Sequence, residues 1–253
     1  MDPSPALLAR SLLFSLLFYV NMIVLMVVGL PTIVLPYAVF LAILRAWSRI
    51  SLWLLRTICG VSVEWRGKEK LPHGSCIVAC KHQSVWETFA LFMLLDDPTF
   101  VLKRELMWIP LFGWLATKSG MIPIDRKARV SSLARMAARA RSEIARGREI
   151  VIFPEGTRRP PGAEPRYMPG VALIYSELNL TCVPIALNSG LFWPRRSLIR
   201  HPGTVLVEVL DPIPAGLAKR TFLAQLQKSI EEATARLVAE GRSQQTAITN
   251  PKR

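Results

Sequence analysis

The chain has 253 residues, enough for one large α/β domain with an appendage. Its 32 Lys and Arg against 18 Asp and Glu favour anionic partners, namely phospholipid headgroups, phosphorylated substrates or nucleic acid, and charge alone does not choose among these. The four cysteines include no Cys-x-x-Cys pair, which indicates a reduced domain facing the cytosol. A zinc site built from Cys76, Cys80 and His73 is a weak alternative on its spacing.

A long apolar segment lies near the N-terminus, with no charged residue between Ser11 and Leu44. As one helix it would be about 51 Å long, whereas the hydrocarbon core of a bilayer is roughly 30 Å thick. Pro31 and Pro36 break it near the middle. Two arrangements fit: a full span over residues 7–29 followed by a short interfacial helix, or a pair of helices embedded in one leaflet. A cleaved signal peptide fits poorly, because the run is too long and no small-residue cleavage site closes it.

Arginines follow this segment and few charges precede it, so the positive-inside rule places the main domain in the cytoplasm. Across residues 41–58, Trp, Leu and Ile alternate with Arg, as in a helix lying along a membrane surface. A core helix with a solvated basic edge is the alternative. We interpret residues 1–58 as membrane-anchoring helices.

Strands and helices then alternate over residues 59–240, which predicts an α/β domain with a mixed, largely parallel sheet flanked by helices. The predicted strands are 61–65, 75–80, 100–102, 120–124, 149–153, 182–187 and 204–210. The predicted helices are 88–95, 129–147 and 219–240. Residues 241–253 are polar and predict a disordered tail.

Polar residues follow the second of these strands at once, and His82 is among them. It therefore lies at the carboxyl end of a strand, where open α/β folds place their active sites. Glu87 comes five positions later, and the turn between strand and helix would let the two side chains face each other. Ser84 and Glu87 also match a capping box, so Glu87 has the alternative role of a helix-start residue only.

A second polar motif, Phe-Pro-Glu-Gly-Thr-Arg-Arg over Phe153–Arg159, follows another apolar strand. It should open on the same edge of the sheet as His82. A glycine beside a carboxylate, a hydroxyl and two guanidinium groups suits a loop that approaches an anion closely.

The two motifs together resemble the glycerolipid acyltransferases, most closely the bacterial 1-acyl-sn-glycerol-3-phosphate (lysophosphatidic acid) acyltransferases. Two further blocks match in the expected order, one from Lys103 to Arg126 and one over Val183–Ala186. The resemblance covers about residues 80–187. One position departs from the family pattern, because Glu87 stands where the family usually has Asp.

The resemblance implies transfer of an acyl group from acyl-CoA or acyl carrier protein to the sn-2 hydroxyl of lysophosphatidic acid, giving phosphatidic acid. His82 would be the general base and Glu87 the acid that orients it; no metal or cofactor is implied. The implied substrate-binding residues are Lys103, Arg126, Glu155, Gly156, Thr157 and Arg158, with the three cations on the phosphate. The enzyme would work among membrane phospholipids at the bacterial inner membrane, with its catalytic domain facing the cytoplasm.

Three other functions compete with this one. The acceptor could be another lyso-lipid, such as an ornithine-lipid precursor or a lysophospholipid with a larger headgroup. A membrane-anchored hydrolase using His82 and Glu87 on water is disfavoured, because no serine or cysteine nucleophile has a recognisable setting. A nucleic-acid-binding module is disfavoured because the aromatic residues fall mostly in apolar runs rather than among basic ones.

Overall fold

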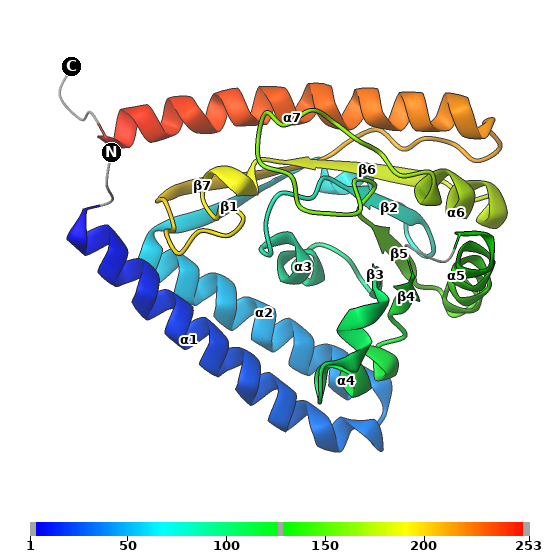
Figure 1. Cartoon of the computed structure of the whole chain (residues 1–253), viewed down its shortest axis with the longest axis horizontal. Helices are drawn as coiled ribbons and strands as arrows, with labels where there is room; N and C mark the ends of the chain where they lie inside the picture. Colours follow the sequence, from blue (N-terminus) through cyan, green and yellow to red (C-terminus); the bar gives the residue numbers. More distant parts are fainter. Residues whose placement is uncertain (1–3, 126–128, 250–253) are drawn as a thin grey trace.

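The computed structural model describes residues 4–125 and 129–249. Its described strands form one seven-stranded sheet in the order β1-β7-β6-β2-β5-β3-β4 (Figure 1). They are β1 Val61–Arg66, β2 Ile77–Cys80, β3 Pro98–Lys103, β4 Ile122–Ile124, β5 Glu149–Ile152, β6 Cys182–Leu187 and β7 Gly203–Val209. Five of the six named pairings are parallel and the β6–β7 pairing is antiparallel. This confirms the predicted largely parallel sheet with a mixed edge.

The central strands β2, β5 and β6 are buried on both faces. Their continuous apolar runs suit such positions, since no side of the strand meets water. In β2, Val78 and Cys80 face one core and Ile77 and Ala79 face the other, as expected from the two-residue period of a strand. The polar segments that follow β2 and β5 therefore leave the sheet at one edge.

Helices cover both faces of the sheet (Figure 1). They are α1 Pro5–Gly29, α2 Tyr37–Cys59, α3 Glu87–Ala90, α4 Phe112–Lys118, α5 Arg129–Ile144, α6 Gly170–Leu178 and α7 Lys219–Thr249. The sequence did not predict α4 or α6. The helix predicted for 88–95 is shorter, because after Ala90 it tightens into a 3₁₀ turn over Leu91–Met93.

The last helix continues to Thr249, so the predicted disordered tail is wrong over Gly241–Thr249. Glycine usually marks a helix end, but here it allows a close approach between two elements. A Cβ atom on Gly241 would lie 2.6 Å from Nδ2 of Asn188, which itself donates a hydrogen bond to the carbonyl of Leu237. The helix therefore packs against the loop after β6 at the residue that looked like its end.

The two N-terminal helices run antiparallel and are joined by a 3₁₀ turn, Leu30–Ile33 (Figure 1). The second has 23 residues and is not the short helix of one predicted arrangement. Each is long and apolar enough, by length and composition, to cross a membrane. One side of the pair belongs to the protein core, where Phe14 and Phe18 of α1 pack with Phe40 and Leu55 of α2.

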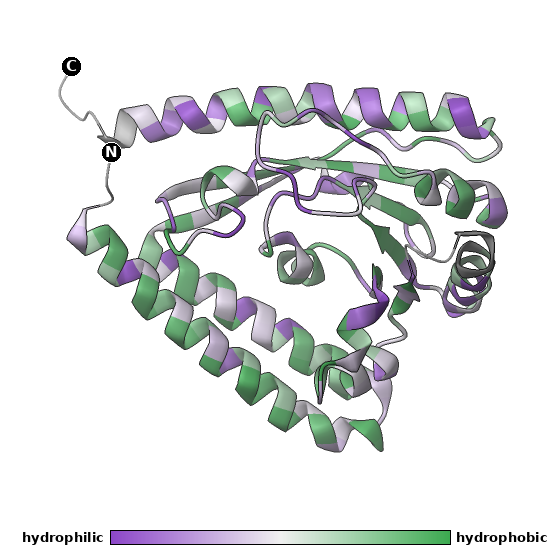
Figure 2. Ribbon diagram, in the orientation of Figure 1, coloured by the Kyte–Doolittle hydropathy of each residue, from purple (hydrophilic) through white to green (hydrophobic). Residues whose placement is uncertain are grey.

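The opposite side of α1 is exposed, and Figure 2 shows that the helix is largely hydrophobic along its length. Its exposed large side chains are Leu8, Leu12, Leu13, Leu16, Tyr19, Val20, Ile23, Val24, Val27 and Val28. A contiguous apolar surface of this extent marks a membrane or protein contact.

Candidate active site

The structure brings the two predicted catalytic side chains together. His82 lies in the loop after β2, Glu87 is the first residue of α3, and Nδ1 of His82 is 2.8 Å from Oε1 of Glu87. The imidazole is 13% exposed and the carboxylate is fully buried. With the Nδ1 proton donated to Glu87, the lone pair of Nε2 is free to accept a proton.

Glu87 also begins the helix, so its contact with His82 and its place at the helix start are compatible. Its Oε1 accepts hydrogen bonds from the backbone N–H groups of Gln83 and Ser84, each at 2.7 Å. The Ser84 hydroxyl accepts one from the backbone of Trp86 at 3.2 Å. The two bonds to Oε1 fix the carboxylate before any substrate binds, which is the preorganisation that a catalytic pair needs.

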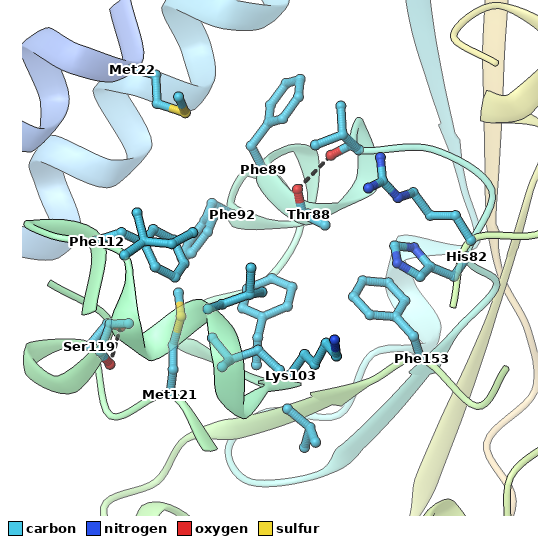
Figure 3. Close-up of a pocket in the computed structure, with 18 of the residues that line it drawn as sticks. Met22, His82, Thr88, Phe89, Phe92, Lys103, Phe112, Ser119, Met121 and Phe153 are labelled. Atoms are coloured by element: carbon cyan, nitrogen blue, oxygen red, sulfur yellow. Dashed lines mark hydrogen bonds between the residues drawn. The ribbon is translucent and has the colours of Figure 1, made fainter. Parts of the chain in front are cut away.

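Two further residues position this pair and were missed by the sequence analysis. The hydroxyl of Ser189, after β6, donates to Oε2 of Glu87 at 2.8 Å. The ring of Phe153 stacks on His82 with a centroid separation of 4.0 Å (Figure 3). Ser189 lies 102 positions from Glu87 and belongs to no short motif. Phe153 is the first residue of the second motif, so the expected proximity of the two motifs is the sequence feature that points to its contact with His82.

Replacing Ser189 by alanine should lower kcat/KM about three- to tenfold, because one donor to a buried carboxylate is lost, a change of about 1 kcal/mol. Steady-state kinetics with a thioester donor would measure the loss. Ser189→Thr, which keeps the hydroxyl, should recover most of it. An alanine variant with wild-type kinetics would contradict the positioning role.

Glu155 connects the two loops from inside the protein. Its Oε1 lies 2.9 Å from Nζ of Lys81, and its Oε2 accepts a hydrogen bond from the backbone N–H of His82 at 3.0 Å. Lys81 also contacts Glu231 of α7 at 2.6 Å, and the Tyr167 hydroxyl donates to the same Glu231 oxygen. Burial raises the pKa of Glu155 and the Lys81 ammonium opposes that shift. Both carboxylate oxygens are thus engaged by the protein, and the geometry favours positioning of the His82 loop over contact with the acceptor.

The other residues implied to bind substrate divide into three groups. Lys103, Gly156 and Arg158 line a large cavity beside His82. Thr157 is exposed and does not line it. Arg126 lies outside the described residues. Gly156 has φ of 64°, the left-handed region that favours glycine, so its place in the motif has a backbone reason.

The cavity has a volume of about 1180 Å³ and extends from His82 between the helix pair and the α/β domain (Figure 3). Most of its wall is apolar. Among the contributors are Met22 of α1, Phe89 and Phe92 after the His82 loop, Phe112 of α4, and Met121 before β4. A long hydrocarbon chain would bury its surface here, while its reactive end would meet the imidazole.

The described residues contain no group of three or more His, Cys, Asp or Glu side chains placed to hold a metal ion. Cys76 and Cys80 are buried in the core and His73 is exposed. The zinc alternative therefore has no support in the part of the chain that the structure describes.

Known proteins resemble this chain in sequence and in fold. The acyltransferase family model matches residues 62–188. The chain is 32% identical to the 1-acyl-sn-glycerol-3-phosphate acyltransferase of Pseudomonas aeruginosa, over 87% of this chain and 86% of that protein. It is 29% identical to the enzyme of that name from Cocos nucifera, over 66% of this chain, and it spans 53% of that longer protein.

A crystal structure of the 1-acyl-sn-glycerophosphate (LPA) acyltransferase from Thermotoga maritima has the same fold, with a TM-score of 0.71. The match covers 92% of this chain and 97% of that one at 23% identity. The family model covers half of the chain, and the Pseudomonas relative matches most of both sequences. The chain therefore belongs to the acyltransferase family that includes the 1-acyl-sn-glycerol-3-phosphate acyltransferases.

Proposed function

We propose that this chain transfers an acyl group from a thioester donor to the sn-2 hydroxyl of lysophosphatidic acid, giving phosphatidic acid and a free thiol. The observation that carries the proposal is the His82–Glu87 pair at the wall of a large apolar cavity. The names of the relatives support lysophosphatidic acid as the acceptor. The donor is acyl-CoA or acyl carrier protein.

The chemistry follows from the geometry of the pair. Nε2 of His82 takes the proton of the acceptor hydroxyl as its oxygen attacks the thioester carbonyl. Glu87, 2.8 Å from Nδ1, stabilises the imidazolium that forms. The tetrahedral intermediate then collapses, the C–S bond breaks, and the departing thiolate receives a proton from the imidazolium. The substrate hydroxyl is the nucleophile, so these reaction steps require neither an acyl-enzyme intermediate nor a metal or prosthetic group.

The acceptor carries a phosphate, and cations near His82 suit it. Lys103 and Arg158 both line the cavity and would bind the phosphate oxygens. Lys103 forms an ion pair with Glu105 at 3.2 Å, but both side chains are about half exposed. Such exposed pairs contribute little, so the ammonium is easily recruited by a phosphate. We assign the same role to Arg126 from its place in the family motif.

The helix pair associates the chain with a membrane, and we place it in the cytoplasmic leaflet of a bacterial inner membrane. Both helices pack along the α/β domain. The ring centroids of Phe18 in α1 and Phe89 in α3 are 5.5 Å apart, and α2 contacts α3. A helix that crossed the bilayer over its full length would carry this polar domain into the hydrocarbon region. Shallow embedding of the exposed α1 surface among phospholipids avoids that cost.

The test is acyl transfer by the purified protein in mixed micelles with labelled lysophosphatidate. Acyl-CoA and acyl carrier protein are offered separately, and phosphatidate is measured by thin-layer chromatography. Product with either donor supports the function and identifies the donor. A folded protein that makes none with both donors would overturn the acceptor assignment, and other lyso-lipids would then be screened.

The cavity makes a prediction about chain length. Replacing Ala116, which is buried in α4 and lines the cavity, by leucine should shorten the space available to an acyl chain. We expect kcat/KM to fall about tenfold for the longest donor accepted, because about two methylene groups at about 0.8 kcal/mol each leave the cavity. Short-chain donors, measured as the control, should react at near the wild-type rate. An equal loss for all chain lengths would indicate that the chain does not reach Ala116.

A further inference from the structure

The segment Trp193–Arg200, which follows β6 and lies outside the motifs matched by sequence, forms part of the active-site wall. Residues of this segment that line the cavity are Trp193, Pro194, Arg196, Ser197, Leu198 and Arg200. It brings two arginines to a cavity that is otherwise mostly apolar.

Hydrogen bonds attach this segment and the turn before it directly to the catalytic loops. The backbone N–H of Gly190 donates to Oε1 of Gln83 at 3.0 Å, and Ser189 contacts Glu87 as described above. Nη1 of Arg195 donates to the backbone carbonyl of Arg158 at 2.8 Å. The segment therefore has a defined position relative to His82 and to the second motif.

Arg200 carries a buried charge without an acidic partner. The residue is 6% exposed, and none of the ion pairs among the described residues includes it. Nη1 donates to the carbonyls of Ser197 and Ile199, at 2.8 and 3.2 Å, while Nε is buried without a hydrogen-bond partner. The guanidinium lies 4.2 Å from the ring centroid of Trp193. Burial lowers its pKa to about 10, so it stays cationic at neutral pH. A buried cation of this kind is costly unless an anion joins it.

Arg196 adds a second sign of function, since its φ is 59° and it is not a glycine. That left-handed backbone conformation is unfavourable for any residue with a Cβ atom. Strain of this sort persists where the surrounding structure over-determines it, and it concentrates at ligand sites. Arg196 is exposed to solvent and also lines the cavity. Among the described residues it forms no ion pair.

We propose that Arg196 and Arg200 form a binding site for a phosphate ester group of one of the two reactants. One guanidinium group can bind two phosphate oxygens at once, and these two, which both line the cavity, suit a group with two negative charges. The phosphate is either that of the lysophosphatidate acceptor or one carried by the donor. The inference rests on the proposed function, and it names the residues that recognise one substrate in that reaction.

The test compares Arg196→Gly, Arg196→Gln and Arg200→Gln with Arg220→Gln, an exposed arginine on α7 away from the cavity. Steady-state kinetics give KM for each reactant, and calorimetry gives the Kd of CoA and of lysophosphatidate. Arg196→Gly is the sharpest variant, because glycine accepts the left-handed conformation and should leave the unfolding midpoint unchanged or raised. A structural role would predict no loss of binding in that variant.

We expect about a tenfold or greater rise in KM and Kd for the reactant whose phosphate is held, with kcat changed less than threefold. If KM and Kd rise only for lysophosphatidate, the site binds the phosphate of the acceptor. If they rise only for the donor and for CoA, the site binds a phosphate of the donor. The proposal is overturned if all constants in both Arg196 variants stay within twofold of Arg220→Gln. A wild-type protein that makes no phosphatidate would refute the proposed function. The phosphate site would still be tested in that case, because calorimetry measures Kd without turnover.

Discussion

Replacing His82 by alanine should lower kcat/KM for phosphatidate formation by about 10³- to 10⁴-fold. The imidazole is the group in the proposed mechanism that removes the hydroxyl proton, and general-base catalysis contributes about 10²- to 10⁴-fold. The fold should tolerate the change, because the ring lies at the cavity wall with 13% of its surface exposed. Thermal unfolding of the variant serves as the control and should be within a few degrees of wild type.

Glu87→Gln is the companion change, since it keeps the side-chain size and removes the charge beside Nδ1. Its activity should fall by about 10²-fold or more, as the imidazolium loses its counter-charge and the amide can impose the wrong tautomer. The two changes together should cost little more than His82→Ala alone, because the residues act as a unit. A folded His82→Ala enzyme that keeps more than a tenth of wild-type activity would rule out the general-base mechanism.

Replacing Lys81 by methionine should destabilise the fold by about 3–5 kcal/mol, the usual cost of removing one partner from a buried ion pair. Lys81 is 4% exposed and contacts the fully buried carboxylate of Glu155 as well as Glu231. Chemical denaturation at neutral pH measures the loss. Lys228→Met is the matched control, because Lys228 and Glu232 form an exposed pair at 4.0 Å, and exposed pairs contribute about 0–1 kcal/mol.

The same variant has a predicted pH dependence. Burial already raises the pKa of Glu155 above its ordinary value of 4.5, and loss of Lys81 removes the main opposing charge. A carboxyl whose folded-state pKa is raised binds its proton more tightly when folded, so its contribution to stability is lost as pH rises. The destabilisation should therefore be smallest below pH 4.5 and deepen above it. Adding Glu155→Gln should restore part of the stability at neutral pH, and no recovery would contradict the assignment.

The sequence predicts those parts of the molecule that depend on local pattern. Apolar runs are enough to place β2, β5 and β6, because strands buried on both faces have few polar residues. The His82–Glu87 contact is also local, since the turn at the end of β2 alone brings the two residues together.

Contacts between segments far apart in the chain could not be predicted from the sequence. Ser189 reaches Glu87 only because β6 lies beside β2 in the sheet. Glu155 belongs to a matched motif, but its pairing with Lys81 and Glu231 depends on how α7 crosses the sheet. The polar composition after residue 240 predicts a tail, whereas the close approach of Gly241 to Asn188 depends on a contact between distant segments.

The position of α1 has a consequence for how reaction rates depend on substrate. Phe18 and Met22 line the cavity while Val20 and Ile23 on the other side of the same helix are exposed. With α1 embedded as proposed, this helix lies between the cavity and the leaflet, and an acyl chain that entered beside it would reach His82 without crossing water. The velocity should then follow the surface mole fraction of lysophosphatidate in the bilayer. Adding inert phospholipid at constant bulk substrate should slow the reaction, so that the enzyme responds to the two-dimensional composition of its membrane.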